Sequence, residues 1–374
     1  MGSDGLAGRD SIAGAETSVA AFVGVTREGP VNQAVEIASF ADFERDYGGL
    51  DRRSPVSFAV LQFFGNGGTR GIVVRVEEPD AAHLVGSESD RTGIHALLDT
   101  DLFNLLLVPD TFDMTNGEEA DVVPQAVSFC ERRRAFYIVD APSNRTAKDI
   151  GSWAQAASRS PNAAAYFPPV CIADPNDSPG SQPRTVAPSG TVAGLYARTD
   201  AARGVWKAPA GTEATLKGVL ELGAALDDRE NARITSLGVN VLRAFPGRGA
   251  VAWGARTMAG AGNDEYKYVP VRRLALFLEE SLYRGTKWAL FEPNDEPLWT
   301  RIRLAADTFL NSLFRLGAFQ GATPSKSFFV KCDSQTTTAS DRENGLVNIL
   351  VGFAPLRPAE FVLIRIQQTA ARPG

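Results

Sequence analysis

The strongest constraint on the fold comes from residues 266–368, where hydrophobic periodicity is clearest. Apolar residues recur at helical spacing over 271–290 and 299–316, and each stretch has one apolar and one polar face. The linker 292–297 separates them, because proline ends one helix and fits the first turn of the next. Three strand-like runs follow, at 327–332, 346–354 and 360–368. This region therefore predicts two helices that each bury one face, followed by a small sheet.

The last strand-like run, 360–368, is apolar on both faces until near its end, which is typical of a strand covered on each side. It lies at the end of the chain, where chains usually fray unless they are held in place. A strong strand in that position indicates a partner strand in another copy of the chain.

Short motifs stand out in the same region: GAFQG at 317–321, FVKCD at 329–333, LVGFAP at 350–355 and RPAEFV at 357–362. Two more occur earlier, TSVAAFVG at 17–24 and GAVAWGART at 249–257. Together they resemble phage tail sheath proteins, which form the contractile sheaths of phage tails, R-type bacteriocins and extracellular contractile injection systems.

The resemblance implies a two-domain sheath fold that mixes α+β and α/β architecture. The expected parts are an extended N-terminal arm at 1–17, a core domain from 18–80 together with 188–357, an inserted α/β outer domain at 81–187, and a C-terminal strand at 358–374 that links to a neighbouring protomer. The core domain is expected to face inward and the inserted domain outward.

Composition and charge argue against several classes of protein. The net charge of −6 argues against a general nucleic-acid binder. No apolar run approaches eighteen residues, and the Gly- and Ser-rich start has no basic segment or apolar core of a secretion signal, so we expect no membrane span and no leader. The 3 cysteines are widely spaced within apolar runs, which indicates buried reduced thiols and assembly in a bacterial cytoplasm.

The middle of the chain leaves an enzymatic alternative open. Strand runs at 103–108, 135–139 and 170–173 alternate with helical segments, which is an α/β layer pattern. Each run is followed by an aspartate, and these are Asp110, Asp140 and Asp174. Three acids at the carboxyl edge of a sheet could hold Mg²⁺ or serve acid/base chemistry. The competing interpretation is that each caps backbone donors in the turn after its strand.

The sequence gives less support to other kinds of catalytic or binding site. The only histidines, His83 and His95, lie in a polar connecting stretch, and no nucleophile-elbow motif is present, so neither a Ser-His-Asp triad nor a zinc site is expected. The glycine cluster at 65–71 follows a helix and precedes a strand, which is the reverse of the order in phosphate-binding loops. We therefore predict a structural protein with no catalytic, cofactor-binding or metal-binding residues.

A helical sheath needs an interface that joins one surface of a subunit to a different surface of the next, and strand donation supplies one. The candidate linking residues are Ser18, Val19, Ala20 and Phe22 near the N-terminus and Phe361, Val362, Leu363, Ile364 and Ile366 near the C-terminus. Candidate contacts to an inner tube are Arg272, Arg273, Arg301 and Arg303, with solvated helix faces or ion pairs inside the protomer as the alternative.

The resemblance also implies partners. These are further copies of the chain in stacked rings, an inner tube protein, baseplate and terminal cap proteins, and paralogous sheath proteins, with no nucleic acid and no membrane insertion. A tail-tube or baseplate component is the nearest rival. The two-chain sheath of type VI secretion fits less well, because both ends of the sheath sequence occur in one chain here. The sequence leaves open whether the particle is a phage tail, a bacteriocin or an injection system.

Overall fold

The computed structural model describes residues 10–178, 181–259, 263, 265–356 and 362–369. The chain forms two compact units. The larger unit contains residues 17–272, and the smaller one contains residues 1–16 together with 273–374. The smaller unit is therefore built from segments that lie at opposite ends of the sequence.

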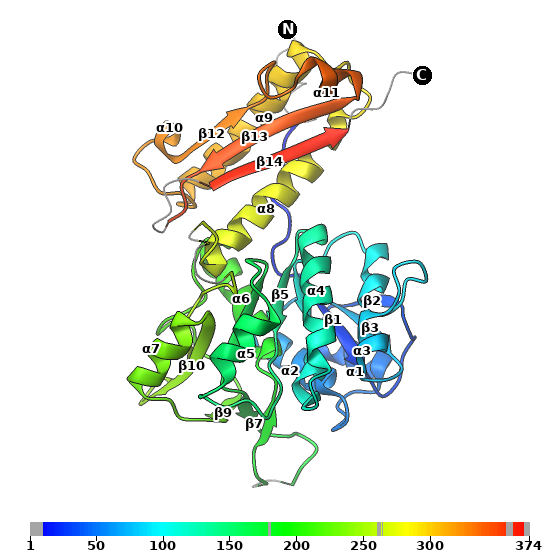
Figure 1. Ribbon diagram of the computed structural model, residues 1–374, viewed down its shortest axis with the longest axis vertical. Coiled ribbons are helices and arrows are strands. Elements are labelled where there is room, and N and C mark those ends of the chain that lie inside the picture. Colours follow the sequence, from blue (N-terminus) through cyan, green and yellow to red (C-terminus); the bar gives the residue numbers. More distant parts are fainter. Residues whose placement is uncertain (1–9, 179–180, 260–262, 264, 357–361, 370–374) are drawn as a thin grey trace. The chain divides into compact units, whose positions relative to one another are not determined.

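An eight-stranded sheet runs through the larger unit in the order β11-β10-β6-β5-β4-β1-β3-β2 (Figure 1). The strands from β10 to β3 in that order are parallel, while β2 and β11 are antiparallel strands at the two edges. The bounds are β1 Ala20–Val25, β2 Ala34–Ile37, β3 Gly71–Val76, β4 Leu105–Leu107, β5 Phe136–Val139, β6 Ala163–Phe167, β10 Val239–Phe245 and β11 Gly249–Ala252.

Helices cover both faces of this sheet. A continuous apolar core joins one face to α3, α4, α5 and α7. On the other face, Phe22 of β1 contacts Phe63 of α2 with ring centroids 5.4 Å apart, and Phe136 of β5 lies 6.4 Å from Tyr196 of α6. The bounds are α1 Phe40–Tyr47, α2 Pro55–Asn66, α3 Ala81–Val85, α4 Glu119–Arg133, α5 Ile150–Ala157, α6 Ser189–Arg203 and α7 Asp228–Ser236, with 3-10 helices η1 Gly93–Asp99 and η2 Pro109–Asp113.

The central strands are buried on both sides, as parallel strands between two helical layers must be. In β1, the residues from Ala20 to Val23 are all fully buried. The predicted α/β layer pattern is thus confirmed. Helix α2 opens at Pro55, with Ser54 as its N-cap. The Ser54 hydroxyl accepts a hydrogen bond from the Ser57 N–H at 3.1 Å, which satisfies one of the free donors at the start of α2.

Helices α2 and α6 pack with their backbones unusually close together. A Cβ atom added to Gly190 of α6 would lie 2.3 Å from the carbonyl oxygen of Ala59, and one added to Gly194 would lie 2.4 Å from that of Phe63. The two glycines are one helical turn apart and meet residues of α2 with the same spacing. Glycine is therefore required at both positions for this helix pair to form.

A second, three-stranded sheet in the larger unit has the order β8-β7-β9. Its strands are β7 Val170–Ile172, β8 Arg184–Val186 and β9 Val219–Leu222. The sequence pattern placed the run 170–173 in the main sheet, and this is wrong. The neighbouring run Ala163–Phe167 takes that place as β6, between β5 and β10. Three consecutive alanines in this run hid the strand, because alanine is uncommon in strands.

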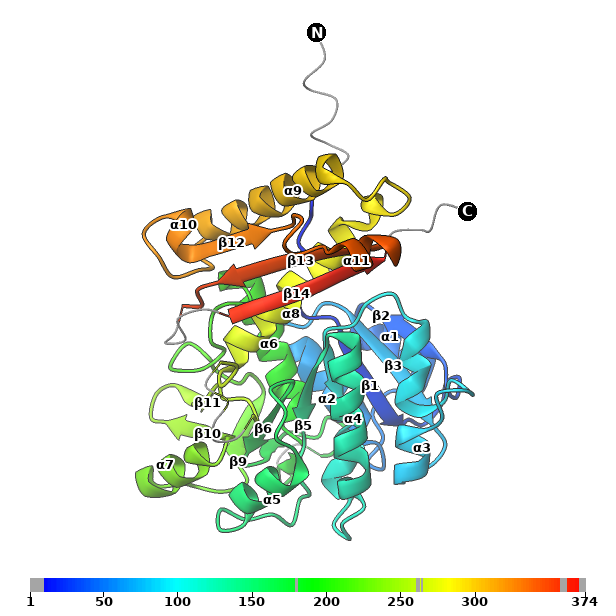
Figure 2. The ribbon, with the colours of Figure 1, turned by 45° about the horizontal axis from the view of Figure 1, so that its top comes forward.

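The smaller unit consists of long helices and an antiparallel sheet of order β12-β13-β14 (Figure 2). Its elements are α8 Val269–Gly285, η3 Lys287–Ala289, α9 Glu296–Arg315, α10 Pro324–Ser327, β12 Phe328–Lys331, α11 Ala339–Glu343, β13 Leu346–Phe353 and β14 Val362–Thr369. The two helices and three strands predicted for this region are confirmed to within a few residues, except that the first helix ends at Gly285. The boundary between the units falls inside α8, after Arg272.

The compact units do not coincide with the predicted core and inserted domains. Strands that precede residue 81, strands within 81–187 and strands after 187 belong to one hydrogen-bonded sheet. The segment 81–187 therefore supplies the centre of a shared sheet and not a separate layer. Motif similarity could not reveal this, because pairing between distant strands leaves no local pattern.

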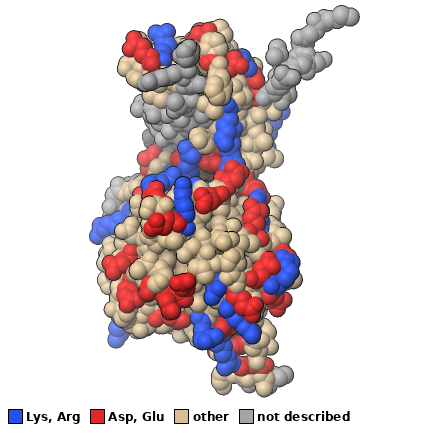
Figure 3. All heavy atoms as spheres, turned by 90° about the vertical axis from the view of Figure 1, so that its right-hand side faces the viewer, with Lys and Arg blue, Asp and Glu red and all other residues tan. Residues whose placement is uncertain are grey.

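The charged surface, the cysteines and the lengths of the helices can be compared with the sequence-based expectations. On the face of the larger unit seen in Figure 3, Lys and Arg side chains are interspersed with Asp and Glu, so this face lacks the continuous basic stripe of a nucleic-acid binder. Cys130, Cys171 and Cys332 are buried free thiols. Within the described ranges, every helix is too short or too polar to cross a bilayer.

Candidate functional site: the C-terminal sheet

The C-terminal sheet of the smaller unit has two edge strands, β12 and β14, on either side of β13. Strand β14 pairs with β13 along eight consecutive register positions, from Leu346 opposite Thr369 to Phe353 opposite Val362. Strand β12 pairs with the other edge of β13 over four positions, from Phe328 opposite Phe353 to Lys331 opposite Leu350. The middle strand is thus held on both sides by segments from the same chain.

The two faces of β13 differ. Val347, Ile349, Val351 and Phe353 alternate along the strand and are at most 1% exposed. Phe353 lies 5.9 Å from Phe319 between ring centroids, so this face is part of the unit's core. On the opposite face, the side chains of Leu346 and Leu350 are only half-buried.

Strand β14 is a long edge strand that follows a break in the described residues, since 357–361 lie outside them. An edge strand presents a row of backbone N–H and C=O groups that can pair with another strand. Such pairing joins subunits because the backbone sets the register and alternate side chains set the specificity. The structure thus places β14 at an edge of this sheet, with β13 as its partner. Phe361 lies outside the described residues, as do the side chains of Val362, Leu363, Ile364 and Ile366.

The predicted N-terminal linking residues lie in or beside a central strand of the larger sheet, and not at a sheet edge. Strand β1 is hydrogen-bonded to β3 on one side and to β4 on the other, so Ala20 and Phe22 have no free edge to offer. Val19 is 2% exposed, and its carbonyl oxygen accepts from the Leu105 N–H at 3.1 Å. Ser18 precedes this strand and is half-buried. The prediction that residues 1–23 pair with a neighbouring protomer is thus wrong for Val19, Ala20 and Phe22, because the central position of β1 satisfies their backbone within the chain.

Residues 10–16, the described part of the predicted N-terminal arm, contact helices of their own protomer. Asp10 accepts two hydrogen bonds from Arg301 of α9, at 2.9 Å from Nε and 3.1 Å from Nη2. The Ala15 N–H donates to the Ser281 hydroxyl of α8 at 2.9 Å. The side chain of Ile12 lies over Gly285, where an added Cβ would come within 2.6 Å of it. This docking site was missed from sequence, although Gly285 near the end of α8 is the one local signal for a close approach.

Arg272, Arg301 and Arg303, which were predicted to contact a tube, make contacts within their own unit. Besides Asp10, Arg301 pairs with Glu292 at 3.3 Å. Arg303 pairs with Glu296 at 2.7 Å, and Arg272 donates to the Asn162 side chain at 2.8 Å. Arg273 is 4% exposed, so the prediction that it faces a tube is wrong, because a contact residue must be accessible. For Arg301 and Arg303 the structure favours the alternative of ion pairs inside the protomer.

The three acids of the enzymatic alternative do not form a common site. Asp110 accepts from the Val25 N–H at 3.3 Å and Asp140 from the Ser189 N–H at 3.0 Å. Asp174 follows β7 in the small sheet and accepts from the Asn176 N–H at 3.0 Å. Of these three hydrogen bonds, only that of Asp174 lies in the turn after its own strand, as the capping interpretation predicts, because Val25 and Ser189 are distant from Asp110 and Asp140 in the sequence. Across the described part of the chain, no group of three or more His, Cys, Asp or Glu residues could hold a metal ion.

Asp110 and Asp140 are buried carboxyl groups with altered acidity. Burial raises the pKa of each to about 7, because a carboxylate inside the protein loses its hydration. Hydrogen bonds from backbone N–H groups oppose the shift but do not cancel it. The stability of the larger unit should therefore depend on pH between the ordinary pKa of aspartate and about pH 7.

Replacing Asp140 with asparagine is expected to reduce the loss of stability between about pH 5 and pH 7.5. The folded chain keeps this proton up to about pH 7, whereas the unfolded chain loses it near the ordinary pKa of 3.8. Since the folded state holds this proton in the window, Asp140 alone lowers the wild-type unfolding free energy by roughly 1.4 kcal/mol per pH unit as pH rises. Asparagine keeps an acceptor for Ser189 and does not titrate. Urea unfolding should show the variant gaining about 2 kcal/mol on the wild type over this range, and identical pH profiles would contradict the assignment.

Comparisons with known proteins point to one protein family. The phage tail sheath protein central domain matches residues 92–258, and the phage tail sheath C-terminal domain matches residues 262–369. Among solved structures, the PVC sheath complex of an extracellular contractile injection system, in its contracted state, is similar with a TM-score of 0.76 and 29% identity, over 96% of this chain and 93% of that one. The helical sheath of the anti-feeding prophage, also contracted, has a TM-score of 0.76 and 28% identity, over 96% and 95%.

Phage relatives are similar over a shorter stretch. The tail sheath protein of Vibrio phage KVP40 is 29% identical over 190 residues, and that of Enterobacteria phage T4 is 25% identical over 190 residues. Each alignment covers 50% of this chain but only 27% and 28%, respectively, of those longer proteins.

The two matched domains together span most of the chain, from residue 92 to residue 369. The chain belongs to the phage tail sheath family.

Proposed function

We propose that this chain is the subunit of a contractile sheath. In this proposal it polymerises helically around a rigid inner tube and, on a signal from the baseplate, rearranges into a shorter and wider lattice that drives the tube through a target envelope. The main support is the similarity to two contracted sheaths, which extends over nearly the whole of each chain at 28% to 29% identity.

The C-terminal sheet supplies a link between subunits. The hydrogen bonds between β13 and β14 are the same whether β14 comes from the same protomer or from a neighbour. Exchange of an identical element therefore gains a connection at little cost in free energy. Because the donor and acceptor surfaces differ, head-to-tail exchange can continue from one subunit to the next, and it produces an open helix when the rotation between subunits does not close a ring.

Contraction is a rigid-body rearrangement in this proposal. The chain consists of two compact units, and their boundaries fall at residues 16–17 and inside α8. A lattice of such subunits can change its twist and rise while the exchanged strands stay paired. The extended lattice would be held kinetically and released once. No nucleotide is consumed in this mechanism.

The proposed partners follow from this role. They are other copies of the chain, an inner tube protein, baseplate and terminal cap proteins, and paralogous sheath proteins. Assembly would take place in the bacterial cytoplasm, and the finished tail or tail-like particle would then be released. The proposed role is structural, in keeping with the family to which the chain belongs.

Electron microscopy of the purified full chain tests the proposal. The chain alone should form wide hollow helical cylinders, and the chain expressed with the tube protein encoded beside it should form narrower cylinders around a tube. Two diameters would demonstrate two lattice states. Single particles in both samples would refute self-assembly, and closed rings or narrow tubes from the chain alone would favour a tube or baseplate component.

A further inference from the structure

The order in which the chain adds strands to the larger sheet reverses direction between β1 and β4. After β1, the chain places β3 on one side of it and then β4 on the other. These three strands are parallel, so their carboxyl ends lie at the same edge. In open α/β sheets, ligands bind outside the carboxyl ends of the strands at such a reversal point. This edge is therefore the first place to look for a binding site.

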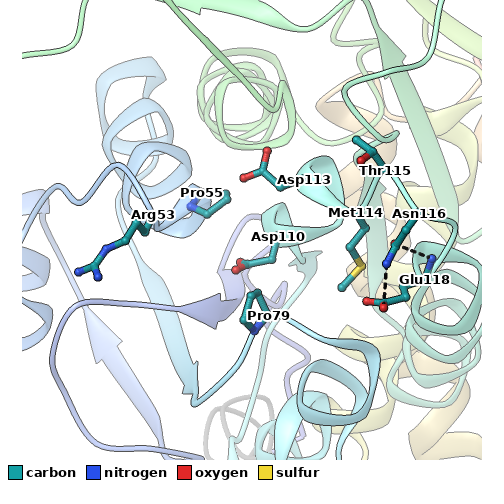
Figure 4. Close-up of a pocket in the computed structure, with 9 residues that line it drawn as sticks. All are labelled: Arg53, Pro55, Pro79, Asp110, Asp113, Met114, Thr115, Asn116 and Glu118. Carbon is teal, nitrogen blue, oxygen red and sulfur yellow. Dashed lines mark hydrogen bonds between the residues drawn. The ribbon is translucent and has the colours of Figure 1, made fainter.

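A pocket of about 280 Å³ lies at this point (Figure 4). Pro55 comes from the first turn of α2, Pro79 from the segment after β3, and Asp110, Asp113 and Met114 from the segment after β4. The prolines and the methionine give it apolar walls. The segments that follow all three strands thus converge on one cavity.

Asp110 provides a buried carboxyl group on the wall of this pocket. The residue is 2% exposed, and no donor in the described residues reaches its Oδ2 atom. A Cβ atom added to Gly24 would lie 1.9 Å from that oxygen, so glycine makes the room for it. Figure 4 shows the carboxyl group directed between Pro55 and Pro79. A buried acceptor without a donor costs about 1–3 kcal/mol, which a bound donor would recover.

Acids outnumber cations among the residues that line the pocket. Asp113 and Glu118 are exposed carboxylates among its lining residues. Arg53 is the single cation of the described lining, and it donates to Asp51 at 3.0 Å, which balances its charge. The described acids contain no group suited to a metal ion. The carboxylate oxygens that line the pocket therefore fit an organic cation better than an anion or a metal ion.

We propose that this pocket binds an alkyl ammonium or alkyl guanidinium group. The cation would lie between Asp110 and Asp113, and its methylene chain would lie against the proline and methionine walls. The volume is just below the roughly 300–1,000 Å³ of pockets that hold drug-sized ligands. It suits one long basic side chain or a small diamine. The cation has two possible sources. One is a soluble amine, and the other is a Lys or Arg side chain of a second copy of the chain. The proposal does not depend on contraction.

Calorimetric titration of the full chain with agmatine, which carries a guanidinium and an ammonium group, tests this proposal. At about pH 8 Asp110 is ionised, because its pKa is about 7. We expect saturable binding that is lost in Asp110→Asn and at least tenfold weaker in Asp113→Asn. Since Asp113 is exposed, its variant should fold even if Asp110→Asn does not. Glu343→Gln, an exposed acid of the smaller unit, is the control and should bind like the wild type.

The same titration on assembled sheaths distinguishes the two sources of the cation. Binding that persists in sheaths supports a soluble amine. Binding that disappears in sheaths, together with a lower sheath yield for Asp113→Asn, supports a side chain of a neighbouring copy. Absence of saturable binding by the unassembled wild-type chain, or equal affinities in the wild type and Asp113→Asn, would overturn the proposal.

Discussion

Replacing Gly190 and Gly194 together with valine is expected to unfold the larger unit under conditions where the wild-type chain is folded. The added Cβ atoms would lie 2.3 Å and 2.4 Å from carbonyl oxygens of α2. Backbone oxygens cannot move aside unless the helices separate, and separation opens the core that α6 covers. One overpacked position costs about 1–3 kcal/mol. Two at the same helix pair, with larger side chains, would remove much of a typical stability of about 5–15 kcal/mol.

Gly65 provides the matched control for this prediction. It lies inside α2, and an added Cβ atom would meet nothing within 4 Å. Gly65→Ala should therefore stabilise the protein by roughly 0.5–1 kcal/mol, because alanine restricts the unfolded chain and favours helix. Circular dichroism during urea unfolding measures both effects. An unchanged midpoint for the double valine variant would show that α2 and α6 are not in backbone contact.

The sequence predicts elements well where the signal is local. Two helices and three strands of the smaller unit were expected from periodicity, and all five were found within a few residues, except that the first helix ends at Gly285. Helix α1 begins after Ser39, whose hydroxyl accepts from the Asp42 N–H at 3.1 Å, and serine is a preferred residue at this capping position. The glycines after α2 form a turn, with Gly67 in a left-handed conformation at φ 118°. All these features depend on residues close together in the sequence.

The errors concern partners that are distant in the sequence. The apolar run at the start of β1 is equally compatible with an exchanged edge strand and with a central strand, and only its pairing with β3 and β4 decides between them. Likewise, Arg273 lies one residue from the half-buried Arg272 on α8, yet it is 4% exposed. The side of a helix that faces the core depends on neighbours that the local pattern does not specify.

The same distinction applies to the acids of the middle region. Their positions after strands were predicted correctly for Asp110 and Asp140, which follow neighbouring strands of the main sheet. Asp174 follows β7 in a different sheet, so three acids on one edge were expected and two are found. The Oδ2 atom of Asp110 has room at the pocket because residue 24, some 86 positions earlier in the chain, is a glycine. No spacing rule connects the two residues.

Exchange of β14 between protomers is expected to produce a disulfide between two different variant chains. Leu350 of β13 lies opposite Arg365 of β14. If one chain carries Leu350→Cys and a second, differently tagged chain carries Arg365→Cys, the two cysteines become register partners only when the strand of one chain pairs with the sheet of the other. Opposed residues in a sheet have Cα atoms about 4.5–5.5 Å apart, within the reach of a disulfide. Oxidised sheaths should therefore yield linked heterodimers on non-reducing gels.

The control for this experiment keeps the same strands but changes the register. Thr369 lies opposite Leu346, four residues from Leu350. Those four residues correspond to about 13 Å along a strand, which is too far for a disulfide. Sheaths mixed from Leu350→Cys and Thr369→Cys chains should thus give no linked heterodimer. The three native cysteines are buried and should not compete.

A chain that carries both Leu350→Cys and Arg365→Cys decides between the two possible pairings. In unassembled protein the disulfide should form within the chain, because β14 pairs with its own β13. In sheaths it should instead join successive chains, so that the doubly substituted protein migrates as a ladder. Sheaths that contain only the internal disulfide, with no heterodimers in the mixed sample, would mean that the subunits are joined by side-chain contacts alone and that β14 does not link them.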